Sequence, residues 1–357
     1  MTSDTGTNFN FDLLKRICEL PGIAGREDAV RTLVREEMAG LVDEISVDAL
    51  GNVVGVRKGQ GGPRVIVMAH MDEIGFIVKH IDDKGFIRLH PVGGFDPRVL
   101  PAQRVIVHGF GGEQLRGALQ ISAKPIHLLD PGDIKPPKVD DLFVDLGMSG
   151  DEVKSRVEVG DMVTLDRTVE RVGSTVMGKS LDDRICVFQM IEALRQLSGP
   201  TQAEIIAVAT TQEEVGLRGA TTSAYAADAD IAVALDITLA QDIPGSAEQD
   251  NVTRLNGGTA IKIMDSSTIS NYKLVRHLRD IAGANDIPYQ LEILPRGGTD
   301  AGAAQRTRGG VPAVTISIPT RYVHTVNEMA SVSDVEASIN LLARYLEHAH
   351  EGQYGFD

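Results

Sequence analysis

The chain has 357 residues, of which 42% are hydrophobic, and this length suggests one large or two moderate domains. Its formal net charge of −15 disfavours partners such as nucleic acid or acidic membrane surfaces, and no apolar run approaches the ~20 residues of a membrane-spanning helix. Residues 1–10 lack the order of a signal peptide and only Cys18 and Cys186 are cysteines, so we expect a cytoplasmic protein without disulfides or a cysteine-ligated metal.

The first 74 residues alternate between helical and strand-like patterns. Apolar positions at helical spacing predict helices over residues 10–20 and 27–41, separated by a breaker run that contains Pro and Gly. Short β-like runs follow at residues 44–47 and 53–56. The apolar run at residues 64–69 predicts a buried strand.

The pattern changes over residues 75–165. Helical periodicity nearly disappears, and short strands alternate with turns such as residues 82–85 and 109–112. Residues 130–137 are rich in Pro, Gly and charge, which predicts an exposed loop. The whole segment is typical of a small β-rich domain.

After residue 172 the chain returns to an alternation of helices and strands. Helices are predicted over residues 180–197, 217–227, 267–285, 299–306 and 333–348, and strands over residues 204–209, 231–235, 259–263 and 313–318, with a short segment at 287–294. The economical fold class is α/β: a mixed, mostly parallel central sheet flanked by helices. We expect this α/β domain to comprise residues 1–74 and 166–357, with residues 75–165 inserted as the β-rich domain.

Histidine and carboxylate side chains follow the predicted buried strands. In open α/β sheets, ligands bind at the carboxyl ends of the strands. A histidine or a carboxylate follows four of the predicted buried strands. A further acidic pair opens the helix that begins near residue 180. The residues concerned are His70 and Asp72, Glu213 and Glu214, Asp236, His324, and the pair Asp182 and Asp183.

Each of these residues taken alone has an ordinary explanation. A histidine in a strand-end loop is commonly a hydrogen-bonding residue, Asp182 could favour a helix N-terminus, and the two glutamates could be solvated loop charges. However, a carboxylate at the buried end of a sheet is costly without a partner. The neighbouring Arg184 and Arg218 could each pair with one acid but not with all of them. A shared metal site explains the whole set better.

The residue types suit a pair of divalent cations. We expect Asp182 to bridge two cations ~3.5–4 Å apart that activate a bridging water, the arrangement of two-metal hydrolases. His70 and Asp236 would be the other protein ligands of one cation, and Glu214 and His324 would be those of the second cation. The negative charges of three carboxylates and a bridging hydroxide balance the positive charges of two divalent cations. Oxygen and imidazole ligands without thiolate suit Zn²⁺, Co²⁺ or Mn²⁺.

Two further acidic residues have predicted roles beside the metals. Asp72, two residues after His70, is placed to hold the other N–H of that imidazole. Glu213 adjoins Glu214, but adjacent side chains diverge, so Glu213 can face the water instead. It would act as general base toward the water and then as acid toward the leaving amine.

Six short motifs occur in order along the chain: Ala-His-Met-Asp-Glu-Ile-Gly at residues 69–75, Leu-Asp-Asp-Arg at 181–184, Gln-Glu-Glu-Val-Gly at 212–216, Leu-Asp-Ile-Thr at 235–238, Gly-Gly-Thr-Asp-Ala at 297–301 and Arg-Tyr-Val-His at 321–324. Together these motifs resemble one family, the tetrahedral (TET) aminopeptidases, which are co-catalytic metallopeptidases that include glutamyl and deblocking aminopeptidases. The resemblance covers nearly the whole chain.

The resemblance implies a function, a site and an assembly. It implies an aminopeptidase that releases N-terminal residues from oligopeptides with two divalent metal ions per subunit, Zn²⁺ or Co²⁺, with Mn²⁺ as a third candidate. It also implies that the inserted domain is PDZ-like and serves dimerisation and assembly, and that dimers form a hollow tetrahedral dodecamer. In the family, the matching positions bind metal at His70, Asp182, Glu214, Asp236 and His324, while Glu213 is the catalytic base and Asp72 orients the first histidine.

Two other classes of function remain open on the sequence. A related two-metal hydrolase, such as a carboxypeptidase, deacylase or amidohydrolase, shares the same ligands. A non-catalytic assembly protein could use the metals structurally, although Glu213, which binds no metal in this scheme, argues against it. The preferred N-terminal residue and the native metal are not decided by the sequence.

Overall fold

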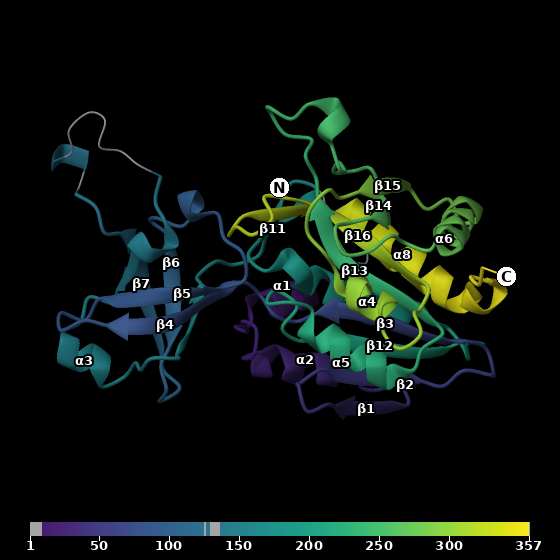
Figure 1. The fold of residues 1–357 in the computed structure, drawn as a ribbon, viewed down its shortest axis with the longest axis horizontal. Helices are drawn as coiled ribbons and strands as arrows, with labels where there is room; N and C mark the ends of the chain where they lie inside the picture. Colours follow the sequence, from purple (N-terminus) through teal and green to yellow (C-terminus); the bar gives the residue numbers. More distant parts are fainter. Residues whose placement is uncertain (1–8, 125, 129–135, 357) are drawn as a thin grey trace.

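The computed structural model describes residues 9–124, 126–128 and 136–356. Most of the loop predicted at residues 130–137, and most of residues 1–10, therefore lie outside the described residues. Two bodies are visible in Figure 1: a large α/β body and a smaller β body beside it. No helix in these ranges is both long enough and apolar enough to cross a bilayer.

A mixed sheet forms the centre of the α/β body. Among the described residues it has 11 strands, and its four central strands, β12, β3, β13 and β16, are parallel to one another. The strands run in the order β1 (Glu44–Val47), β2 (Val53–Arg57), β12 (Glu204–Thr210), β3 (Arg64–His70), β13 (Ile231–Leu239), β16 (Ala313–Arg321), β17 (Glu328–Ser331), β11 (Thr175–Gly178) and β10 (Glu170–Val172), with β14 (Thr259–Met264) paired to β16 and to β15 (Tyr289–Ile293).

Helices cover both faces of this sheet. Alternate residues of β3 face opposite ways: Val65 and Val67 join the larger core, whereas Ile66 and Met68 join the smaller one. A strand that is apolar at every position is expected when both faces are covered. The larger core contains α1 (Phe11–Glu19), α2 (Asp28–Met38), α4 (Leu181–Gln196), α6 (Tyr272–Ala284) and α8 (Val332–His348), and the smaller one contains α5 (Arg218–Ala227) and α7 (Asp300–Gln305).

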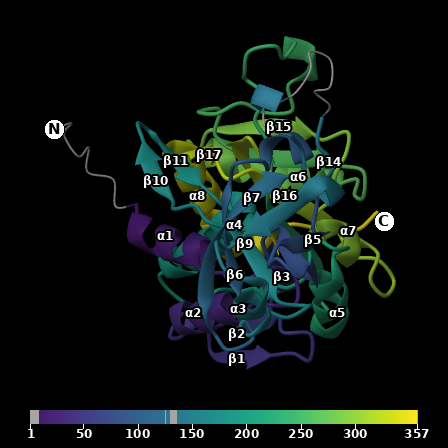
Figure 2. The ribbon, with the colours of Figure 1, turned by 90° about the vertical axis from the view of Figure 1, so that its left-hand side faces the viewer.

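The smaller body is a closed antiparallel barrel with its own apolar core, which includes Phe76, Val105 and Val144. Figure 2 views the molecule from the barrel side. A short helix, α3 (Gly150–Lys154), adds Val153 to the core. The barrel order is β4 (Gly75–Ile81), β5 (Ile87–Val92), β8 (Leu142–Asp145), β7 (Gln114–Ile121), β6 (Arg104–His108) and β9 (Met162–Leu165).

The predicted fold class is confirmed: a largely parallel sheet flanked by helices accompanies a separate small β domain. One predicted helix is too long at its start, since the segment expected to be helical from residue 267 enters α6 only at Tyr272. The Asp265 carboxylate accepts the N–H groups of Ser267 and Thr268, which holds a turn there. The side chain of Asn271 then caps the helix.

Candidate metal centre

The central strands end at one edge of the sheet and deliver two of the predicted ligands there. His70 is the last residue of β3 and lies in register with Thr210, the last residue of β12. Asp236 was expected directly after its strand, but β13 continues to Leu239, so Asp236 lies within the strand opposite Ser317 of β16. The parallel register therefore places both side chains at this edge.

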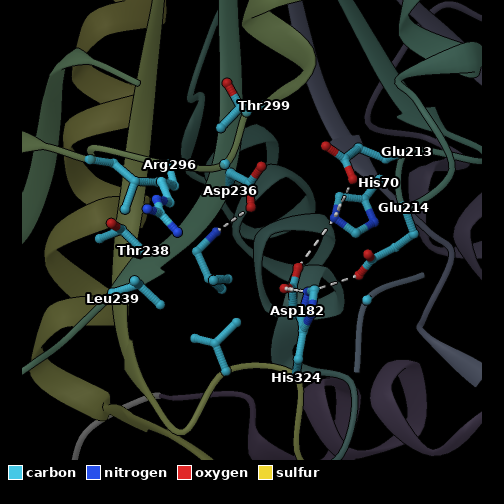
Figure 3. A pocket seen from close by; sticks show the side chains of 16 residues that line it. His70, Asp182, Glu213, Glu214, Asp236, Thr238, Leu239, Arg296, Thr299 and His324 are labelled. Atoms are coloured by element: carbon cyan, nitrogen blue, oxygen red, sulfur yellow. Dashed lines mark hydrogen bonds and ion pairs between the residues drawn. The ribbon is translucent and has the colours of Figure 1, made fainter. Parts of the chain in front are cut away.

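Loops and a helix start supply the other predicted residues. Glu213 and Glu214 lie between β12 and α5, and His324 lies between β16 and β17. Asp182 belongs to the first turn of α4, but its backbone (φ −74°, ψ 108°) is not helical. Figure 3 shows these side chains with His70 and Asp236 around one cavity. The volume of this cavity is about 490 Å³.

The Asp182 carboxylate lies between the two histidines. Its two oxygens are each 3.2 Å from an imidazole Nε2, one of His70 and the other of His324. The His324 Nε2 is also 3.4 Å from Glu214 Oε1. Ligand atoms of His70, Asp182 and Glu214 lie within 4.8 Å of one another, and the same holds for His70, Asp183 and Asp236. All five side chains predicted to bind metal thus line one cavity.

The charges of the site are strongly coupled. Burial alone would lower the pKa of His324, but hydrogen bonding to Asp182 and Glu214 raises the pKa to about 12. Burial would raise the pKa of Asp182, but the contacts with His324 and His70 outweigh it and lower that pKa. Asp182 is therefore the carboxylate that stays ionised most readily, as a bridging ligand must.

The other acids of the cavity resist ionisation. Burial raises the pKa of Glu213, Glu214 and Asp236, and neighbouring carboxylates raise it further. Asp182 completes a set of four carboxylates on the cavity wall. Cations would relieve this repulsion, and carboxylate oxygens with imidazole nitrogens are the donors that Zn²⁺, Co²⁺ and Mn²⁺ accept. The donor set therefore fits divalent metal ions.

Asp72 makes contacts beyond the one expected from the sequence. The His70 Nδ1 is 3.0 Å from the backbone carbonyl of Asp72 and 3.5 Å from its carboxylate. The carboxylate itself accepts the backbone N–H groups of Glu213, at 3.0 Å, and Glu214, at 3.2 Å. Asp72 thus links the loop after β3 to the loop that carries the two glutamates.

Two buried carboxylates play a similar part that no sequence pattern indicated. Asp183 accepts the backbone N–H of His70 at 3.2 Å. Glu328 accepts the backbone N–H of Asp182 at 3.0 Å and that of His324 at 2.8 Å. The sole hint in the sequence was proximity, since Asp183 follows Asp182 directly and Glu328 comes four residues after His324.

The remaining wall of the cavity is mixed in character. Leu239, Leu294 and Val323 provide apolar surface, and Thr238 and Thr299 provide hydroxyl groups. Arg296 is the only lysine or arginine among the described residues that line the cavity. Figure 3 shows it across the cavity from Glu213 and Glu214.

Comparison with known proteins points to one peptidase family. Residues 51–341 match the family described as M42 glutamyl aminopeptidase. The chain is 36% identical to the lysyl aminopeptidase of Pyrococcus furiosus over 95% of this chain and 97% of that protein. Among solved structures, a TET aminopeptidase from the marine sediment archaeon Thaumarchaeota archaeon SCGC AB-539-E09 superposes with a TM-score of 0.91 at 35% identity, covering 94% of this chain and 95% of that one.

A second solved structure concerns assembly. It is the TET1 peptidase of Pyrococcus horikoshii, described as able to assemble into a tetrahedron or a large octahedral shell. It superposes with a TM-score of 0.83 at 31% identity, covering 94% of this chain and 98% of that one. The predicted TET resemblance is confirmed by these matches, and the chain belongs to the M42 glutamyl aminopeptidase family of peptide hydrolases.

Proposed function

We propose that the chain releases N-terminal residues from short peptides with a pair of divalent cations held at the edge of its sheet. The placement of Asp182 between the two histidine Nε2 atoms, at 3.2 Å from each, carries this proposal. His70 and Asp236 would hold one cation, Glu214 and His324 the other, and Asp182 both. The ligand types favour Zn²⁺ or Co²⁺, with Mn²⁺ as a third candidate.

Glu213 is proposed as the general base. Its carboxylate lines the cavity, and its Oε2 is 3.9 Å from the Nε2 of His70, whereas the Asp182 carboxylate is 3.2 Å from that atom. When bound, the cations would lower the pKa of a water molecule and polarise the scissile carbonyl. Glu213 would take the proton from that water and pass it to the departing amine. Asp72 would hold both the His70 ring and the loop that carries Glu213.

A panel of aminoacyl-anilides tests this function. We expect hydrolysis to stop after chelation and to return when Zn²⁺, Co²⁺ or Mn²⁺ is added back. N-acylated amino-acid anilides, which lack a free amine, serve as the matched control and should stay intact. Release of the acyl group from the acylated compounds, with the anilide bond left intact, would instead support a deacylase.

The cellular setting of the protein is proposed on separate grounds. Cys18 and Cys186 are both buried and unpaired, which suits a reducing cytoplasm. The relative from Pyrococcus horikoshii can assemble into a tetrahedron or a large octahedral shell, which supports a homo-oligomer for this chain, and we propose a tetrahedral dodecamer as its form. We assign catalysis to residues 1–74 and 166–357, and dimerisation and assembly to the barrel domain, residues 75–165.

Replacement of Arg296 should change the preference for the N-terminal residue. A guanidinium in the cavity attracts an acidic side chain and repels a basic one. Arg296→Gln should therefore lower the rate on a glutamyl anilide relative to a lysyl anilide, by about tenfold for a change of ~1.4 kcal/mol. A leucyl anilide is the control and should change little. An unchanged glutamyl-to-lysyl ratio would mean that Arg296 does not meet the substrate side chain.

A further inference from the structure

Glu328 lies between the two chain segments that carry Asp182 and His324. It is the first residue of β17, and its Cα pairs with Gly178 of β11, four residues before Asp182. Its side chain is buried, with 2% of the residue exposed, and does not line the cavity. Glu328 Oε2 accepts the Asp182 N–H at 3.0 Å, and Oε1 accepts the His324 N–H at 2.8 Å.

Both of these N–H groups belong to backbone that departs from regular structure. Asp182 has an extended ψ of 108° at the start of α4, so its N–H has no place in the helical pattern. His324 has a φ of +62°, in the left-handed region that residues other than glycine rarely adopt. Such a conformation persists when surrounding contacts hold it. One carboxylate supplies a contact to each.

We propose that Glu328 is a positioning residue that sets the separation of Asp182 and His324, and thereby the affinity of the site for the cation that these two residues share with Glu214. This inference rests on the proposed two-metal function, which it deepens. Glu328 touches neither the substrate nor a cation. It acts through the backbone of two ligands that are 142 residues apart in the chain. The Asp182 carboxylate and the His324 ring, 3.2 Å apart, would then move together.

The rival explanation is that Glu328 only stabilises the fold. The chain offers a matched control, because Asp334 is also a buried carboxylate, 1% exposed, that accepts two backbone N–H groups. Its oxygens receive the N–H of Asn256 at 2.7 Å and that of Gly258 at 2.8 Å. Neither group belongs to a cavity-lining residue. Asp334→Asn therefore removes the same type of contact without reaching the site.

The experiment compares Glu328→Gln with Asp334→Asn in the full chain. Each amide keeps one acceptor oxygen but turns an NH₂ group toward the second backbone N–H. The readout is Co²⁺ binding, followed by the visible absorption of the bound ion during titration with a competing chelator, together with thermal unfolding of the metal-free proteins. We expect Glu328→Gln to bind one of its two Co²⁺ ions about 10–100-fold more weakly than wild type. Asp334→Asn should match wild type in Co²⁺ affinity while unfolding at a lower temperature.

Equal Co²⁺ affinities in Glu328→Gln and wild type would overturn the inference, and so would equal losses in both variants. If Glu328→Gln does not fold, Glu328→Asp replaces it, because aspartate keeps the charge but is one methylene too short to reach both N–H groups. For Glu328→Asp we expect a smaller loss of Co²⁺ affinity than for Glu328→Gln. An affinity equal to that of wild type would again overturn the inference. The Co²⁺ titration uses no substrate, so it can be interpreted whether or not the wild-type protein hydrolyses aminoacyl-anilides. A wild type that is inactive on those anilides would refute the aminopeptidase proposal without affecting this test of Glu328.

Discussion

Glu213→Gln should lower kcat by about 10³-fold while the protein still binds two divalent cations per subunit. General acid–base groups typically contribute 10²–10⁴-fold, and glutamine keeps the shape of glutamate but cannot accept a proton. Burial raises the pKa of Glu213 well above its ordinary value, the direction that makes its carboxylate a stronger base. The measurement is the steady-state rate on an aminoacyl-anilide, with the metal content determined on the same sample.

The adjacent residue gives the control for this prediction. Glu214→Gln makes the same chemical change one position later, at a side chain 3.4 Å from the His324 Nε2. Because Glu214 is proposed as a ligand, its substitution should lower the metal content as well as the rate. If Glu213→Gln instead loses metal, or keeps its activity, the division of roles between the two glutamates is wrong.

The predicted cluster depended on a rule about strand ends. The apolar run before His70 predicted a buried parallel strand, and the rule that ligands collect at the carboxyl ends of such strands pointed to the residues that follow. The structure places His70, Asp182, Glu214, Asp236 and His324 around one cavity. For Asp236 the prediction held although the predicted strand ended four residues too early, since the parallel register, not the boundary, sets its position.

Contacts between side chains and distant backbone could not be predicted in this way. Glu328 accepts the N–H of Asp182 because β17 lies beside β11. This antiparallel pairing leaves no periodic signal in the sequence. Closure of the barrel was equally hidden, because it depends on β4 meeting β9 across about 80 residues. Hydrophobic patterns report which face of a strand is buried, and they carry no information about its neighbour.

Asp182→Asn should remove the bound cations and lower kcat/KM by more than about 10⁴-fold, a change of ~5.5 kcal/mol in the transition-state barrier. The Asp182 carboxylate lies 3.2 Å from the Nε2 atoms of both histidines, and an amide offers a single neutral oxygen where a bridge needs two charged ones. Metal analysis after gel filtration, with the rate on an aminoacyl-anilide, measures both effects. Retention of two cations per subunit would contradict the bridging role.

The neighbouring Asp183 makes this prediction discriminating, because the ligand atoms of His70, Asp183 and Asp236 also lie within 4.8 Å of one another. Asp183, however, is fully buried, does not line the cavity, and uses one oxygen to accept the N–H of His70. Asp183→Asn should therefore lower thermal stability and keep two cations per subunit, because asparagine can still accept that N–H. If Asp183→Asn empties the site and Asp182→Asn does not, the bridging carboxylate is Asp183, and the two cations lie deeper beneath the sheet edge than we propose.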